Sequence, residues 1–306
     1  MSGVLIGFAI VGFVIFVGYI AARYQIAGPH GVQVLTKTAF FITNPALLFT
    51  VLAQADLDVV FSVYAPIALI TAALTAAVYV LASRLWFPRP VAATAIGAMS
   101  SSYVNANNIG IPIALYALGN ATPVAPVLLV QLLILAPLYL LVMDLSSGRK
   151  ANAKTLLTQP LRNPMIIASF LGMLVAATGF RLPAGALEPM VMLGGAAVPL
   201  VLMAFGMSLH GSRPLQAREG RTEALVATAL KSTAMPLITY LVGHFVFRLD
   251  SPHLFAAVIM AALPTGQNVF MIASRYNLGV GVSRETVLLS SILAVPALFV
   301  AAWLLA

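Results

Sequence analysis

The stretch Ser102-Tyr103-Val104-Asn105-Ala106-Asn107-Asn108-Ile109-Gly110-Ile111-Pro112 lies inside a hydrophobic segment, yet it contains three asparagines, a glycine and a proline. In hydrocarbon, each unsatisfied backbone or side-chain polar group costs several kcal/mol. A membrane helix that is interrupted here must therefore be buried in protein or face a water-filled cavity. A second stretch of this kind is Ala262-Leu263-Pro264-Thr265-Gly266-Gln267-Asn268. We expect the two stretches to form one site.

The composition is that of a polytopic membrane protein. The 306 residues are 61% hydrophobic and 8% charged, whereas a soluble domain carries roughly 25% charged residues. The mean hydropathy is +1.02. The chain has no cysteine, so disulfides are excluded. The formal net charge of +8 is better explained by the basic loops of a membrane protein than by nucleic-acid binding.

Charged residues and Gly/Pro clusters divide the chain into ten apolar segments. A membrane helix needs about 20 mostly apolar residues, and each segment is close to that length. The fourth and ninth segments contain the two interrupted stretches. We expect an all-α protein with spans at about residues 4–23, 32–53, 62–86, 92–118, 123–145, 161–179, 187–210, 222–247, 253–277 and 283–305.

The basic residues predict the orientation of these spans, because Lys and Arg accumulate in cytoplasmic loops. If the N-terminus is outside, 13 of the 16 Lys and Arg residues fall in the odd-numbered loops. Only Arg181 and Arg248 fall in the even-numbered loops, and Lys231 lies inside a helix. This distribution predicts ten spans with both termini outside the membrane.

Five helices is an odd number, so a second set of five would run in the opposite sense, as in many transporters. We expect residues 1–145 to form the first inverted repeat, 146–160 a cytoplasmic linker and 161–306 the second repeat. Several residues recur in the same order. Asn108, Tyr116, Leu118 and Gly119 recur 160 positions later as Asn268, Tyr276, Leu278 and Gly279, while Pro45 corresponds to Pro199 and Pro137 to Pro296.

Glycine and proline predict the positions of the two breaks. We expect Gly110 with Pro112, and Pro264 with Gly266, each to split a span into two half-helices. Each break would expose one helix N-terminus, with about half a positive charge, to the protein interior, where an anion could bind. The alternative is a pair of proline kinks satisfied by neighbouring helices. The amides that could satisfy the backbone or contact a ligand are Asn105, Asn107, Asn108, Gln267 and Asn268.

Lys231 lies about nine residues into its helix, which places it roughly 13 Å deep. A lysine at the centre of a membrane helix costs about 2.5–3.5 kcal/mol, so a functional role is the default hypothesis. It could face a substrate carboxylate, or act as a fixed cation where a relative binds a metal ion. The alternative is a structural lysine that pairs with amides or reaches the membrane interface.

Two further polar positions interrupt apolar helices. We interpret Asn44-Pro45 as a hinge or packing break, with direct ligand contact as the alternative. Gln131 is equally a site residue or an interhelical hydrogen-bonding group. The sequence shows no metal-ligand spacing among its histidines, no nucleophile–base set and no nucleotide fingerprint. We therefore expect no metal, no cofactor and no enzymatic activity.

The two interrupted segments resemble the auxin efflux carrier family. Asn105 with Gly110-Ile111-Pro112 and Tyr116 is similar to the fourth helix of that family, and Ala262-Leu263-Pro264-Thr265-Gly266 to the ninth. The resemblance runs over most of the chain. Further matching positions are Phe270, Tyr276-Asn277, Asn44-Pro45, Gln131, Arg162-Asn163-Pro164 and Lys231.

The resemblance implies a fold shared with the bile acid–sodium symporters. The first, second, sixth and seventh helices would form a scaffold and a homodimer interface, where Gly3, Gly7 and Gly12 could pack closely. The other helices would form a transport domain that moves as an elevator, with helices four and nine crossing at the substrate. Bacterial members are associated with small organic acids such as malonate. Asn105, with Pro112 and Pro264, carries over as a crossover residue and a carboxylate contact.

Two departures from the family pattern refine the expected substrate. The plant members have apolar residues and a second proline where this chain has Gln267-Asn268-Val269, so a smaller and more polar anion than auxin is favoured. Pro264 falls near a glutamate of the sodium-coupled relatives, which disfavours sodium coupling.

The sequence therefore predicts a secondary transporter or facilitator of small organic acid anions in the bacterial inner membrane. The alternatives are a sodium-coupled symporter of the bile acid type and a ligand-binding membrane sensor. Its expected partners are the substrate, the bilayer and a second copy of the chain, with no nucleic acid. The candidate substrate-binding residues are Asn105, Asn107, Asn108, Gly266, Gln267, Asn268, Lys231, Gln131 and Asn44, and the crossover or hinge residues are Gly110, Pro112, Pro264 and Pro45.

Overall fold

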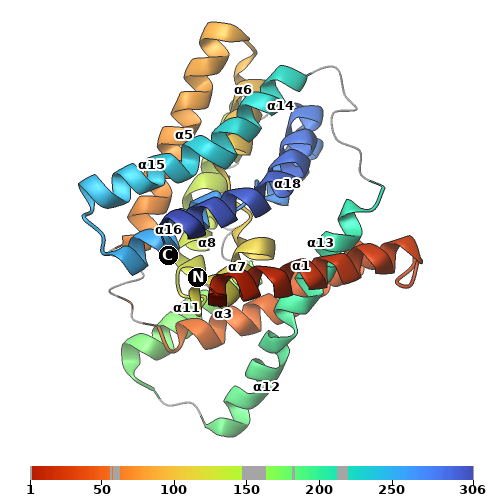
Figure 1. The fold of residues 1–306 in the computed structure, drawn as a ribbon, viewed down its shortest axis with the longest axis vertical. Helices are drawn as coiled ribbons and strands as arrows, with labels where there is room; N and C mark the ends of the chain where they lie inside the picture. The colour runs from red at the N-terminus through yellow and green to blue at the C-terminus, as the bar shows by residue number, and fades with distance from the viewer. Residues whose placement is uncertain are drawn as a thin grey trace. The chain divides into compact units, whose positions relative to one another are not determined.

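The chain is helical throughout almost all of the part that the computed structural model describes (Figure 1). Among these residues the extended pairing is limited to one antiparallel bridge, between Val104 and Thr265. The expected linker at 146–160 lies outside the described residues, apart from Ser146. The described residues are 2–55, 57, 63–146, 163–180, 183–211 and 220–305.

The described helices have the lengths and compositions of membrane spans. Six are long and apolar enough to cross a bilayer, and four shorter apolar helices accompany them. An all-helical polytopic membrane protein is thereby confirmed, while the ten crossings and the inverted repeat stay predictions. The six long segments are Gly31–Leu52, Ala65–Trp86, Val124–Ser146, Gly185–Leu209, Arg221–Val246 and Val280–Leu305, and the shorter ones are Gly12–Arg23, Ala106–Leu118, Pro164–Thr178 and Ser251–Ala262.

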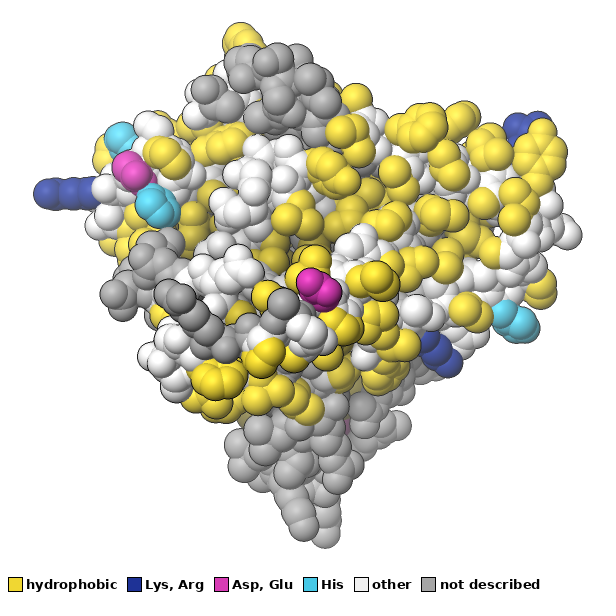
Figure 2. Space-filling view, turned by 90° about the horizontal axis from the view of Figure 1, so that it is seen from below, with side chains coloured by type: hydrophobic (Ala, Val, Ile, Leu, Met, Phe, Trp, Pro, Cys, Tyr) yellow, Lys and Arg dark blue, Asp and Glu magenta, His cyan; other side chains and the backbone are white. Residues whose placement is uncertain are grey.

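Large apolar side chains cover much of the surface, as the face in Figure 2 shows. Phe13, Trp86 and Trp303 are 67%, 75% and 71% exposed. Such exposure is unfavourable in water but not in a bilayer, where the lipid tails are as apolar as the side chains.

The described residues divide into two compact units, and each unit draws on both halves of the chain. The chain passes from one unit to the other within the π-helical turn η3 (Ala106–Gly110) and within α8 (Val124–Val130). The first unit is drawn from Met1–Ser62, Asn107–Pro126 and Thr158–Ser212, and the second from Val63–Ala106, Val127–Leu157 and Arg213–Ala306.

In the first unit, α1 packs along α13, and α3 packs against α11 and α12. Glycines allow the closest approach. A Cβ atom at Gly206 of α13 would lie 1.9 Å from the Ile15 carbonyl oxygen of α1, and one at Gly18 would lie 2.3 Å from the Met203 oxygen. The helices of this unit are α1 (Ser2–Arg23), α2 (Gly31–Thr38), η1 (Ala39–Thr43), α3 (Asn44–Leu52), α7 (Ile111–Ile113), η4 (Ala114–Leu118), α11 (Pro164–Thr178), α12 (Ala184–Gly195) and α13 (Ala197–Leu209).

The second unit contains both of the breaks, at residues 103–105 and 263–266. Its helices are α5 (Ala65–Trp86), α6 (Val91–Ser102), η5 (Gln131–Leu135), α9 (Ala136–Ser146), α14 (Arg221–Ala229), η6 (Leu230–Ala234), α15 (Met235–Leu241), η7 (Val242–Val246), α16 (Ser251–Ala262), α17 (Gln267–Tyr276) and α18 (Val280–Leu305).

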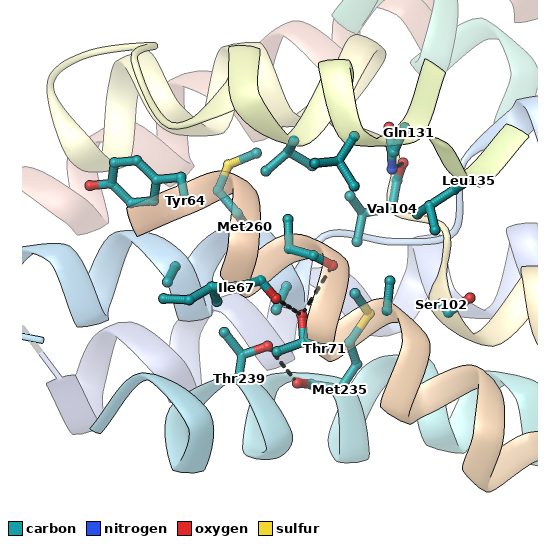
Figure 3. Close-up of a pocket in the computed structure, with 16 residues that line it drawn as sticks. Tyr64, Ile67, Thr71, Ser102, Val104, Gln131, Leu135, Met235, Thr239 and Met260 are labelled. Atoms are coloured by element: carbon teal, nitrogen blue, oxygen red, sulfur yellow. Dashed lines mark hydrogen bonds between the residues drawn. The ribbon is translucent and has the colours of Figure 1, made fainter. Parts of the chain in front are cut away.

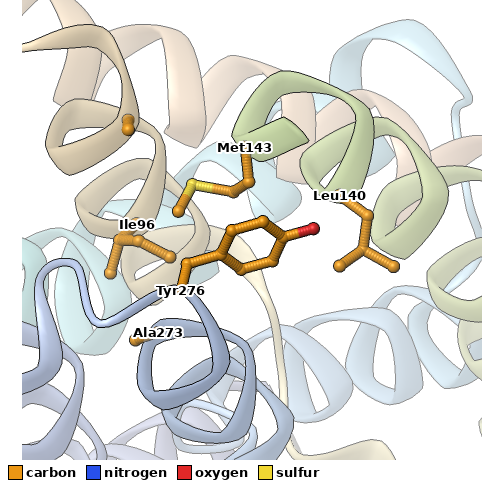
Figure 4. Packing of buried hydrophobic residues seen from close by; sticks show 6 residues of the cluster. Ile96, Leu140, Met143, Ala273 and Tyr276 are labelled. Atoms are coloured by element: carbon orange, nitrogen blue, oxygen red, sulfur yellow. The ribbon is translucent and has the colours of Figure 1, made fainter. Parts of the chain in front are cut away.

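A buried apolar cluster fixes α17 within this unit (Figure 4). Ile96 of α6 and Met143 of α9 pack against Ala273 and Tyr276 of α17. The Tyr276 hydroxyl donates a hydrogen bond to Asp144 at 2.5 Å. The helix that follows the second break is therefore held to the helix that precedes the first.

Four π-helical turns are each followed, two residues later, by a proline: η1 by Pro45, η3 by Pro112, η5 by Pro137 and η6 by Pro236. Proline has no N–H, and its ring clashes with the carbonyl group four residues earlier. A wider turn gives the ring room and keeps the helix continuous. The residue before the proline then donates its N–H five residues back, from Asn44 to Ala39, from Ala136 to Gln131 and from Met235 to Leu230.

The expected interruption of the helix at Asn44-Pro45 is therefore wrong, while the role of these residues as a hinge stays a prediction. The segment Gly31–Leu52 runs through Pro45 as a continuous helix. The proline is accommodated by the wide turn before it, so no break is needed.

We expect Gly206→Ala to force α1 and α13 apart. Overpacking a tight contact typically costs about 1–3 kcal/mol, so thermal unfolding in detergent should begin at a lower temperature. Gly185→Ala is the matched control, because a Cβ atom there meets nothing within 4 Å. Equal unfolding temperatures for the two variants would contradict the close helix contact.

Candidate functional site

Two helices, α6 and α16, stop in mid-segment within the second unit, and the chain resumes as helix a few residues later. After α6 ends, the backbone is extended through Tyr103, Val104 and Asn105, and helix resumes at Ala106. After α16 ends, the chain is non-helical over 263–266, and α17 follows. Both interruptions leave peptide groups without partners inside their own helices.

The two extended segments satisfy one another by pairing antiparallel. The Asn105 N–H donates to the Pro264 carbonyl at 2.7 Å, and the Gly266 N–H donates to the Tyr103 carbonyl at 2.9 Å. A Cβ atom at Gly266 would lie 3.1 Å from both the Tyr103 ring and the Val104 carbonyl oxygen. Glycine is therefore the residue that lets the segments approach. We call this paired region the crossing.

The structure corrects the expected position of the first break. Gly110 has φ −63° and ψ −44°, which is helical, and Pro112 lies in the short helix α7. The break lies earlier, at Tyr103 to Asn105, because the segment around Thr265 supplies its pairing partner there. Pro112 is absorbed by the wide turn η3. The second break is found where Pro264 and Gly266 predict it.

Buried side chains complete the hydrogen bonding of the crossing. The Thr265 hydroxyl donates to the Ser100 carbonyl at 2.6 Å, and the Thr265 N–H donates to the Ser290 hydroxyl at 3.0 Å. Gln131 donates from Nε2 to the Val104 carbonyl at 2.8 Å. Gln131 thus stabilises the crossing. This contact is compatible with both of its expected roles, as a site residue and as an interhelical hydrogen-bonding group.

Sequence reasoning missed Thr265 and Ser290. Thr265 is fully buried, and Ser290 is 1% exposed. A hydroxyl between Pro264 and Gly266 was a usable signal, because the N–H groups and carbonyls of a broken helix need side-chain partners. Ser290 offered no such signal, since serine is ordinary in a membrane helix.

Lys231 is fully buried in η6, and its ammonium group donates to the Ala261 carbonyl at 2.6 Å. Ala261 lies in the last turn of α16, where carbonyls lose their helical partners. A cation is favourable at a helix C-terminus. Lys231 thus pairs with the backbone at the second break. Of the roles that the sequence left open, this contact best matches a structural lysine that pairs with amide groups.

The remaining candidates in this unit lie around the crossing. Asn105 is 4% exposed. Gln267 is half-buried and Asn268 is exposed, and both lie in the first turn of α17. The Asn268 side chain is hydrogen-bonded to that of Tyr103. The start of α17 therefore presents amide side chains and helix N–H groups directly after the crossing.

The other asparagines form a separate group in the first unit. Asn44 donates from Nδ2 to Oδ1 of Asn107 at 2.7 Å, and Asn107 donates from Nδ2 to Oδ1 of Asn108 at 2.9 Å. The Oδ1 atom of Asn44 and the hydroxyl of Thr43 are buried and have no hydrogen-bond partner among the described residues. The structure thus brings the candidates together in two groups, one in each unit.

A small cavity adjoins the crossing (Figure 3). Val104, Gln131 and Ala261 line it, together with Thr71 and Thr239 from the neighbouring helices and several apolar side chains. Both threonine hydroxyls donate to carbonyls of their own helices. Its volume of about 30 Å³ is enough for about one or two water molecules.

Two carboxylates are buried near the ends of their helices. Glu223 in α14 is 6% exposed and Glu285 in α18 is 2% exposed. Arg89 pairs with Glu223 through Nε at 2.5 Å, and Arg284 pairs with Glu285 at 2.9 Å. Each buried charge therefore has an opposite charge beside it, as burial requires.

We expect Thr265→Val, which keeps the shape of the side chain, to weaken the crossing. The loss of a buried hydrogen bond costs about 1–2 kcal/mol, so thermal stability should fall. Thr178→Val is the matched control, because that hydroxyl is exposed and donates to the Leu174 and Val175 carbonyls of its own helix. If the Thr265→Val variant unfolds at the wild-type temperature, the Thr265 hydroxyl does not stabilise the crossing.

Known proteins resemble the chain over nearly its whole length. A Rhizobium meliloti (strain 1021) protein named "Putative malonate transporter" is 26% identical over 290 residues, covering 92% of this chain and 89% of that protein. An Escherichia coli (strain K12) protein named "Uncharacterized transporter YfdV" is 23% identical over 274 residues, covering 86% and 85%. The family described as membrane transport protein matches residues 4–302. The chain therefore belongs to this family of membrane transporters, the auxin efflux carrier family that its interrupted helices resemble.

Proposed function

We propose that this transporter moves small organic acid anions, mono- or dicarboxylates, and that the crossing holds the substrate. The observation that carries the proposal is the pairing of Asn105 with Pro264 and of Gly266 with Tyr103. It sets two interrupted helices side by side, and interrupted helices are where transporters of this general design bind their substrates.

The groups around the crossing favour an anion. α17 starts there, and a helix start carries about half a positive charge. Asn105, Gln267 and Asn268 supply amides that can donate hydrogen bonds to a carboxylate. Lys231 adds a buried positive charge at Ala261. The relative named for malonate suggests a dicarboxylate of that size.

The substrate is proposed to bind on the side of the crossing where α17 starts, and not in the apolar cavity. The cavity holds about 30 Å³, far below the roughly 300–1,000 Å³ of ligand pockets. Transport would proceed by alternating access of the elevator type, in which the unit that contains the crossing moves. A homodimer through the first, second, sixth and seventh predicted helices, and both termini outside the bacterial inner membrane, belong to the same proposal.

We expect Asn105→Ala and Lys231→Ala to weaken substrate binding without loss of expression. A hydrogen bond to a charged group contributes about 1.5–3 kcal/mol, so the substrate Kd should rise about tenfold or more. Counterflow of labelled malonate into proteoliposomes would measure transport, and a thermal-shift titration would measure affinity. Asn120→Ala is the control, because Asn120 caps an exposed turn at Thr122.

Wild-type uptake in both variants would disprove the assignment of these residues. Malonate that raises the unfolding temperature of the wild-type protein but shows no counterflow would instead favour the membrane sensor.

Uptake is expected to persist when choline replaces sodium. Lys231 already places a cation at the end of α16, and a second cation beside it would be repelled. The measurement is the initial rate of uptake in proteoliposomes at constant ionic strength. Loss of uptake in choline would favour a sodium-coupled symporter of the bile acid type.

A further inference from the structure

A second, apolar groove lies on the second unit, and its lining contains none of the residues that pair at the crossing. Part of its lining comes from α5 and α6, which pack against one another (Figure 1). Another part comes from η5 and α9, including Ile134, Leu138 and Val142. Its volume is about 620 Å³, which is in the range of ligand pockets.

Alanines create this groove. Ala72, Ala73, Ala76 and Ala77 recur at intervals of three and four residues, so they lie on one face of α5. Their methyl groups are too short to fill the space between α5 and α9. The polar part of the lining is confined to few residues, so the groove suits a hydrocarbon chain.

Two arginines line the same groove at the turn between α5 and α6. Arg84 is in the last turn of α5, and Arg89 precedes α6. Arg84 makes no ion pair with any residue that the structure describes. Arg89 pairs with Glu223 through Nε, yet its side chain is 46% exposed, so the other guanidinium nitrogens are available. The groove therefore has a positive end.

The position of this end fits a membrane surface. Trp86, at the same turn, is 75% exposed, and exposed tryptophans mark the membrane–water interface. By the charge distribution of the loops, this turn is on the cytoplasmic side. From Arg84 back to Leu69 the groove follows α5 for roughly 22 Å, which exceeds one leaflet's half of a hydrocarbon core about 30 Å thick.

We propose that this groove binds an anionic phospholipid of the cytoplasmic leaflet. One acyl chain lies along the alanine face of α5, and the phosphate group lies against Arg84 and Arg89. Basic pockets between membrane helices on the cytoplasmic side commonly bind anionic headgroups. The apolar lining excludes a free anion as the main ligand. A zwitterionic lipid has no net charge, so its electrostatic attraction to the two arginines is weaker than that of an anionic lipid.

Native mass spectrometry of the full chain in detergent tests this proposal. The protein is incubated with phosphatidylglycerol and phosphatidylcholine that carry identical acyl chains. Wild-type protein should retain phosphatidylglycerol preferentially. Arg84→Gln should lower that retention about fivefold, because one basic residue near the surface contributes about this factor, and should lower phosphatidylcholine retention by a smaller factor.

Ala77→Leu tests the acyl-chain part of the site. Ala77 is exposed, so the larger side chain fills the groove without disturbing the core, and retention of both lipids should fall. Arg23→Gln and Ala177→Leu are the matched controls, because both residues are exposed on other helices. All four variants should unfold at the wild-type temperature.

Three results would overturn the proposal. Equal retention of the two lipids by wild-type protein would remove the headgroup preference. Unchanged phosphatidylglycerol retention in either groove variant would remove the site. Displacement of the lipid by glycerol 3-phosphate at equal concentration would show a site for a free phosphate and not for a phospholipid.

Discussion

The need to satisfy every peptide group inside a low-dielectric environment governs this structure. One broken helix in hydrocarbon would leave its N–H and carbonyl groups without partners. Two breaks within the second unit satisfy each other, because Asn105 pairs with Pro264 and Gly266 with Tyr103. Side chains from further helices then complete the crossing: Gln131 of η5 donates to Val104, and Ser290 of α18 accepts from the Thr265 N–H. The polar stretch therefore persists inside an apolar protein.

The existence of the two breaks could be predicted from the sequence, because amides, glycine and proline in apolar segments are rare enough to mark a break. The second break lies at Pro264 to Gly266 as expected. The first break does not lie at Gly110 and Pro112, because the wide helical turn η3 accommodates the proline within a helix. The break lies instead where the chain pairs with the segment around Thr265. That partner is distant in sequence, as Ser100 is from Thr265, so local patterns do not contain it.

The same distinction applies to the candidate site. The sequence predicts that Lys231 is deep in its helix, and the structure buries it fully, but its contact with Ala261 depends on how η6 packs against the end of α16. The asparagines were treated as one group because they are adjacent in sequence. The structure instead assigns Asn105 to one unit and joins Asn107 to Asn44 in the other. This chain thus has hydrogen-bonded polar side chains in both of its compact units.

The proline-linked π-helical turns also change the rotational phase of a helix. An α-helix advances about 100° per residue, and a turn that holds one extra residue displaces all later side chains around the axis by about that angle. Thr239 in α15, which follows η6, is therefore not on the face that a continuous helical wheel would give it. Each wide turn before a proline thus changes which sides of its span face protein and lipid beyond that turn.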